Sequence, residues 1–88
     1  MENFIEKVNY MTRVLQSKIP LYIRCFVDLK VERATICCYA LSTSFVVDNT
    51  NVDTLLTMIE SIANKWRDMY DKEIKEMVEE NAKDNGKR

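Results

Sequence analysis

The fold is decided by residues 21–30, which read LYIRCFVDLK. Every odd position of this stretch is apolar, whereas the even positions mix aromatic and charged side chains. A period of two residues is typical of a β-strand that buries one face. The stretch therefore predicts a strand whose second face carries Tyr22, Arg24 and Phe26.

The sequence that follows predicts two more strands. Charged residues cluster from Asp28 to Arg33 without Gly or Asn, which favours a loop built on a type I turn over a tight two-residue turn. β-Branched and aromatic residues then predict a second strand over residues 34–41, a turn at 42–44 and a short third strand at 45–47. We expect an antiparallel meander; one longer strand over residues 34–47 is the alternative.

A helix is predicted before the strands, over residues 2–18. Phe4, Val8, Met11 and Leu15 recur at helical spacing and form an apolar stripe. The only proline, Pro20, disfavours helical backbone at the residue before it and so ends the helix.

A second helix is predicted after the strands, beginning near a polar cluster at residues 48–51. Thr50 with Asp53 resembles a capping box, and Asn51 is an alternative cap. Apolar residues then recur with a period of 3.6 from Val52 to Val78. We therefore expect a single α+β domain over residues 1–82, of the order αβββα with both helices on one sheet face. A polar tail, residues 83–88, is expected to fray.

The length of the second helix has a consequence for assembly. Thirty helical residues span about 45 Å, whereas a globule of this size is only about 30 Å across. The apolar stripe on the overhanging turns must be covered, and a second copy of the chain would cover it. This predicts a homodimer; a monomer with frayed last turns is the alternative. The predicted interface residues are Trp66, Met69, Tyr70, Ile74, Met77 and Val78.

The residues that usually carry catalysis are missing. The chain of 88 residues has no histidine, one glycine and three cysteines. Without histidine neither the usual general base nor a partner for a cysteine nucleophile is present, and three thiols do not complete a tetrahedral zinc site. We expect no enzyme activity, no cofactor and no metal. The cysteines are expected to be reduced, with a disulfide between Cys25 and Cys38 on neighbouring strands as the alternative.

Hydropathy predicts a chain that stays out of membranes. The first residues lack the basic and apolar regions of a secretory signal, and no window reaches the 18 or so apolar residues that a membrane span needs. We expect a cytoplasmic protein, in the host cytoplasm if a virus encodes it.

These observations leave binding as the function. The first hypothesis is a homodimeric interaction protein that binds an unidentified protein partner, in the style of small accessory proteins of viruses and mobile elements. The alternative is nucleic-acid binding on the open sheet face, although a net charge of −1 supplies no basic field. The residues of that face would be Tyr22, Arg24, Phe26, Arg33 and Tyr39.

Overall fold

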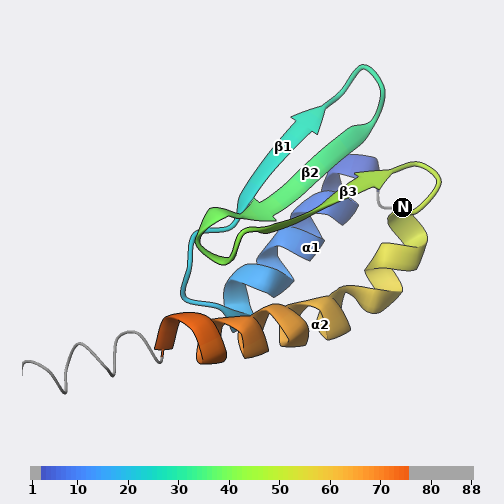
Figure 1. The fold of residues 1–88 in the computed structure, drawn as a ribbon. Helices are drawn as coiled ribbons and strands as arrows, with labels where there is room; N and C mark the ends of the chain where they lie inside the picture. The colour runs from blue at the N-terminus through green and yellow to red at the C-terminus, as the bar shows by residue number, and fades with distance from the viewer. Residues whose placement is uncertain (1–2, 76–88) are drawn as a thin grey trace, which may run out of the picture.

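The computed structural model of the chain describes residues 3–75 and has the predicted αβββα order (Figure 1). Its three strands form one antiparallel sheet in the order β1-β2-β3, which confirms the meander. The elements are α1 (Phe4–Lys18), β1 (Arg24–Asp28), β2 (Arg33–Cys38), a 3₁₀ turn (Tyr39–Leu41), β3 (Thr43–Asp48), α2 (Val52–Met69) and a π-helical turn (Tyr70–Lys75).

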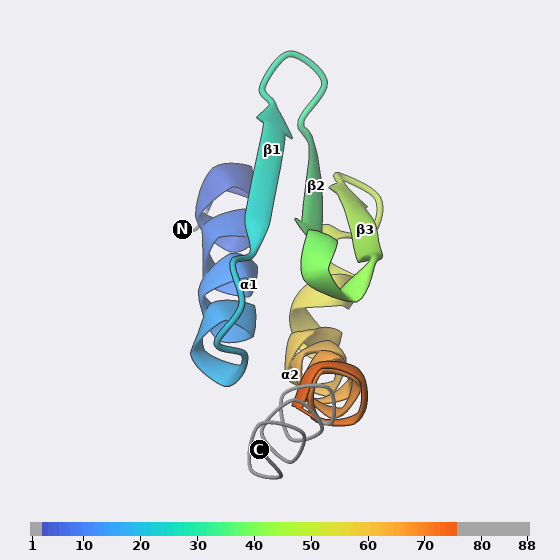
Figure 2. The same cartoon turned by 60° about the vertical axis from the view of Figure 1, so that its left-hand side comes forward.

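Both helices lie on the same side of the sheet, with α1 near β1 and α2 near β3 (Figure 2). They run in the same direction and are linked at both ends. Lys7 Nζ lies 2.9 Å from Asp53 Oδ1 at the start, and Arg67 donates to the Lys18 carbonyl oxygen at 3.0 Å at the end. The core between helices and sheet is a single cluster of buried side chains, which includes Met11, Leu15, Ile36, Val47, Ile59 and Trp66.

Two loops of four residues join the strands, after the closing pairs Asp28–Arg33 and Cys38–Thr43. The last residue of each loop, Glu32 and Ser42, has a positive φ, of 46° and 52°. The second strand therefore ends at Cys38 rather than at residue 41, because residues 39–41 turn in a 3₁₀ conformation to reach β3.

A positive φ at Glu32 in the first loop costs conformational free energy, because the Cβ atom of a residue other than glycine lies too close to the backbone. We expect Glu32→Gly to raise the free energy of unfolding by about 0.5 kcal/mol, because glycine adopts a positive φ without the steric cost. Urea titration measures the change. The matched control is Lys30→Gly, in the same loop but without a positive φ, which should not stabilise; equal effects of both substitutions would contradict the interpretation.

The first strand is less buried than its alternating sequence predicted. Ile23 is buried and Cys25 is half-buried, but Val27 and Leu29 are exposed. The β1–β2 hairpin extends past the body of the helices (Figure 1), and at its far end Leu29 only borders an open hollow shared with Phe4 and Ile5 at the start of α1. The prediction that every odd residue lies in the core is therefore wrong for the last two.

The start of α2 also differs from the predicted capping box. Asp48 Oδ1 accepts hydrogen bonds from the backbone N–H groups of Thr50 and Asn51 and from the Thr50 hydroxyl. Asn51 is the cap residue, but its side chain bonds back to the end of β3 and not to the first turn of the helix. The hydrogen bond from the Thr50 hydroxyl, followed by those from the Thr50 and Asn51 N–H groups, lowers the pKa of the Asp48 carboxyl. Thr50 is thus engaged with the loop and not with the helix.

Candidate interaction surface

The face of the sheet that points away from the helices has no covering element in the described residues. Paired residues of antiparallel strands project to the same face, so the register defines the surface. We call it the open face. It consists of Arg24, Phe26 and Asp28 on β1, Arg33, Thr35 and Cys37, itself buried, on β2, and Ser44, Val46 and Asp48 on β3.

At one end of the open face, the guanidinium group of Arg24 lies among three aromatic rings. Its central carbon is 5.9 Å from the ring centroid of Tyr22, 5.3 Å from that of Phe26 and 5.4 Å from that of Tyr39. The three rings are 72%, 48% and 64% exposed. We call these four residues the Arg24 cluster. Three cation–π contacts hold a charged side chain and large apolar area in one arrangement on the surface.

The other end of the open face carries one basic and two acidic side chains. Arg33 is paired across the strands with Asp28 on one side and Asp48 on the other. Arg33 also contributes to lowering the pKa of the Asp48 carboxyl, after the hydrogen bonds from Thr50 and Asn51. The predicted surface set is therefore split, because four of its five residues form the Arg24 cluster and Arg33 lies between two aspartates.

Between the two ends lies a row of three residues, of which the sequence analysis did not predict Val46. Phe26, Thr35 and Val46 are neighbours across the three strands, and Val46 is exposed. The alternation of residues 43–48 contains the signal, since Val47 is buried and Val46 must then face outward. Val46 extends the apolar surface of the Arg24 cluster across the full width of the sheet.

The predicted helical interface is largely used within the chain itself. Trp66 is only 3% exposed, and its ring contacts Phe45 edge to face at 5.7 Å. Met69, Tyr70 and Ile74 are partly buried and pack against the same core. Met77 and Val78 lie outside the described residues. Trp66 therefore has almost no surface left for a second subunit.

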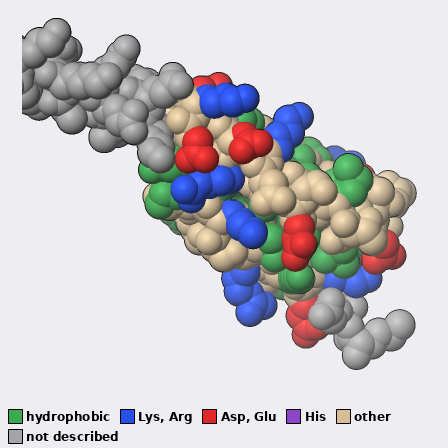
Figure 3. Space-filling model, turned by 90° about the horizontal axis from the view of Figure 1, so that it is seen from below, with side chains coloured by type: hydrophobic (Ala, Val, Ile, Leu, Met, Phe, Trp, Pro, Cys, Tyr) green, Lys and Arg blue, Asp and Glu red, His purple; other side chains and the backbone are tan. Residues whose placement is uncertain are grey.

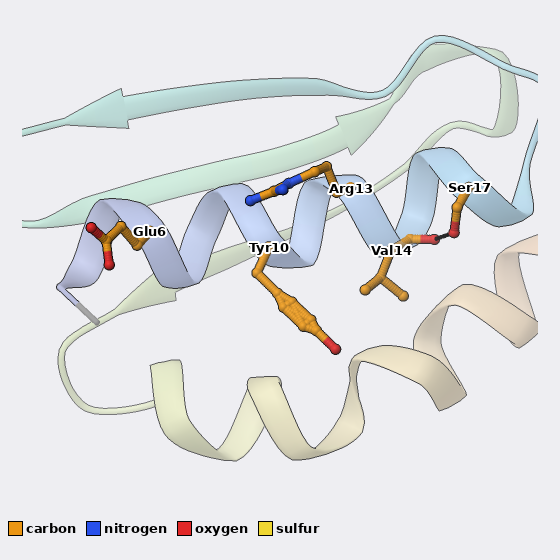
Figure 4. Close-up of a pocket in the computed structure, with 5 residues that line it drawn as sticks. All are labelled: Glu6, Tyr10, Arg13, Val14 and Ser17. Carbon is orange, nitrogen blue, oxygen red and sulfur yellow. Dashed lines mark hydrogen bonds between the residues drawn. The ribbon is translucent and has the colours of Figure 1, made fainter. Parts of the chain in front are cut away.

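The helix side of the molecule shows a different character. Acidic and basic side chains are interspersed with hydrophobic ones over this side (Figure 3). An open hollow of about 540 Å³ runs along α1, lined by Glu6, Tyr10, Arg13, Val14 and Ser17. Tyr10 and Val14 point from α1 toward α2 at this hollow, and Ser17 bonds to a backbone oxygen of its own helix (Figure 4). The residues that line it do not form a group of interacting charged and aromatic side chains like the Arg24 cluster.

The cysteines do not meet as the alternative prediction required. Cys25 is paired with Ile36 and Cys38 with Thr43, so the two are not directly opposite one another, and all three thiols are free. Burial raises the pKa of the Cys25 thiol above its usual value of 9.0. A raised pKa keeps the thiol protonated at neutral pH, which makes Cys25 a weaker nucleophile.

Over residues 3–75, no three Cys, Asp or Glu side chains come close enough together to hold a metal ion. In the same residues no helix combines the length and the apolar character that crossing a membrane requires.

No protein-family model, no curated protein and no solved structure matches this chain.

Proposed function

We propose that the chain is a non-catalytic interaction protein that acts as a homodimer and binds another protein through the open face of its sheet. The observation that carries the proposal is the Arg24 cluster. Residues that dominate binding energy in protein interfaces are enriched in Tyr, Trp and Arg, and they gather at the centre of a patch. Here Arg24 on β1 and two tyrosines that flank the strands are gathered at one end of the open face.

The arrangement of the cluster lowers the cost of binding. Ordering a flexible side chain at an interface costs about 0.5–1.5 kcal/mol. Arg24 is already held against three rings, and Phe26 is fixed on the same strand two residues away. A partner that covers the cluster would therefore bury a large area while only a few side chains lose conformational freedom.

Charge favours a protein partner over nucleic acid. Binding to a phosphate backbone draws its affinity from several cations that replace condensed counterions. On the open face the positive charges of Arg24 and Arg33 are matched by the negative charges of Asp28 and Asp48. The whole chain carries a net charge of −1.

Nucleic-acid binding is the second candidate, and one observation favours it. Aromatic side chains beside an arginine on an exposed three-stranded sheet can stack unpaired bases. Stacking is worth about 1–3 kcal/mol per base and needs no global basic field. Under this alternative, affinity for single strands would fall with salt and depend on Tyr22, Phe26 and Tyr39.

The double substitution Arg24→Ala with Tyr39→Ala tests the proposal. The immobilised chain is exposed to an extract of the cells in which it is expressed, and retained proteins are quantified by mass spectrometry. Arg13→Ala with Tyr10→Ala is the matched control, because it removes the same residue types from the helix side. We expect at least one protein to be retained by the wild type and the control, and its retained amount to fall about tenfold or more with the double substitution at Arg24 and Tyr39, the open-face variant. A tenfold loss corresponds to about 1.4 kcal/mol of binding free energy, which the removal of two hot-spot residues readily exceeds.

A parallel titration with labelled oligothymidylate decides between the two candidates. Binding that weakens with salt and is lost in the open-face variant would replace the protein partner by single-stranded nucleic acid. Retention of the same proteins by the open-face variant and the wild type would contradict binding through this face altogether.

A further inference from the structure

The two edges of the sheet are not equivalent. At the β3 edge, the Asn51 side chain donates to the Val46 carbonyl oxygen at 3.0 Å and accepts from the Asp48 N–H at 2.8 Å. These backbone groups therefore point away from β2. Residues of an antiparallel strand direct their N–H and C=O groups alternately to one side and the other. The β3 edge is thus partly closed by the chain itself.

The same alternation, applied to the paired residues of the three strands, determines which β1 residues direct their backbone groups to the free edge. The backbone groups of Val46 and Asp48 point away from β2, so those of their β2 partners point toward β1. Arg24, Phe26 and Asp28 therefore direct their N–H and C=O groups to β2. Cys25 and Val27 direct theirs to the free edge of the sheet. Ile23, the next residue in this outward series, does donate its N–H away from β2, to Gln16 Oε1 at 3.1 Å. Cys25 and Val27 have no such side-chain partner in the described part of the chain. Their edge is open for one more strand.

The sequence of β1, Arg24–Asp28, is complementary to itself in the antiparallel direction. If two β1 strands pair about a twofold axis at Phe26, Cys25 of each lies opposite Val27 of the other and the outward groups of both are paired. Arg24 of each chain then lies opposite Asp28 of the other on the open face. Opposite charges in such cross-strand pairs are favourable. A shift of the axis to Val27 would instead place Arg24 opposite Lys30.

We propose that two copies of the chain associate by antiparallel pairing of their β1 strands, centred on Phe26, into one continuous sheet of six strands. The inference rests on the homodimer of the proposed function and names how it is held together. Each chain contributes the N–H and C=O of Cys25 and Val27, so four backbone hydrogen bonds cross the axis. Pairing also covers Val27, which is 38% exposed in the single chain, and it brings the two Arg24 clusters onto one continuous face.

Proline at position 27 separates this interface from the fold. The Val27 N–H points away from β2, so Val27→Pro leaves the ladder within the chain intact but removes two of the four bonds across the axis. We expect the dimer dissociation constant to rise at least about 30-fold. The matched control is Ser44→Pro, which removes an outward N–H at the other edge of the sheet and should dimerise like wild type.

Sedimentation velocity over a concentration series measures the association of wild type and both variants, with circular dichroism to verify folding. A wild type that stays monomeric, or a Val27→Pro variant that dimerises as well as wild type, would overturn the proposal. Under this proposal the Tyr70→Ser variant dimerises like wild type. Loss of the dimer in that variant alone would show that the interface lies on the helices and would contradict the proposal.

Cysteine cross-linking keeps the test decisive if the proline variant fails to fold. Facing residues at a non-hydrogen-bonded position have Cα atoms about 4.5 Å apart, within the range of a disulfide. Phe26→Cys is therefore expected to form a covalent dimer under mild oxidation, whereas Val46→Cys, exposed on the same face at the other edge, is not. Equal cross-linking of both would overturn the register. If the chain does not dimerise, binding of a protein partner by the Arg24 cluster can still be measured in the monomer, so the two proposals are tested separately.

Discussion

Replacement of Trp66 by alanine is expected to lower the free energy of unfolding by about 3–5 kcal/mol, the range for a large aromatic residue removed from a core. Trp66 is 3% exposed, lies between α2 and the sheet, and contacts Phe45 edge to face. A small domain has only about 5–15 kcal/mol of stability in total. The variant is therefore expected to unfold at much lower urea concentration than wild type.

The exposed Met58, on the same helix, supplies the control, and Met58→Ala should change stability by less than about 0.5 kcal/mol. The experiment also separates a core role from the interface role predicted from the sequence. An interface residue would affect the dimer dissociation constant and leave the stability of the single chain within about 1 kcal/mol of wild type. That result would contradict the position of Trp66 in the core.

Replacement of Gln16 by alanine is expected to cost about 2 kcal/mol, because it removes three hydrogen bonds of about 0.5–1.5 kcal/mol each, some of which water replaces. The Gln16 amide donates to the backbone oxygens of Leu21, at 2.6 Å, and Ile19, at 3.3 Å, and its oxygen accepts from the Ile23 N–H. One side chain thus holds the segment that leads from α1 to β1.

Urea titration of Gln16→Ala and Gln16→Glu measures this effect. The carboxylate of Gln16→Glu retains the acceptor for Ile23 but places an anionic oxygen against the Leu21 and Ile19 carbonyl oxygens, so a loss at least as large as that of Gln16→Ala is expected. Ser17→Ala, which removes a bond within the same helix, is the control. A change no larger than that of the control would show that other contacts hold the connection.

The order of elements could be predicted from the sequence because each element has a strong period of its own. The stripe of Phe4, Val8, Met11 and Leu15 is buried as predicted. The alternation in residues 21–29 places the strand but does not define how far the helices extend beneath it. Val27 and Leu29 are exposed for that reason, since burial at the end of a strand depends on the neighbouring layer and not on the strand's own pattern.

The end of the last helix shows the same limit. Its apolar period continues past Met69, but the backbone changes to a π-helical turn over Tyr70–Lys75. At this point Arg67 bonds to the Lys18 carbonyl oxygen, contacts the Tyr70 ring at 5.3 Å and pairs with Asp71 at 3.3 Å. The bond to Lys18 joins residues 49 positions apart, so no local pattern predicts it, whereas the contacts with Tyr70 and Asp71 lie within about one helical turn.

The open face was predictable in part. Parity along β1 and β2 places Arg24, Phe26 and Arg33 outward without any structure. The register is what separates Arg33 from the cluster, because it pairs that residue with Asp28 and Asp48. The difference between the two edges could not be predicted, since it depends on the side chains of Gln16 and Asn51 reaching the backbone from other elements.

The central claim is that the open face is the surface that binds a partner. Amide chemical shifts of the isotope-labelled chain, recorded with and without a protein retained in the capture experiment, test it most directly. We expect the largest changes at Tyr22, Arg24, Phe26, Tyr39 and Val46. Changes confined to α1 and α2, with the open face unaltered, would contradict the claim.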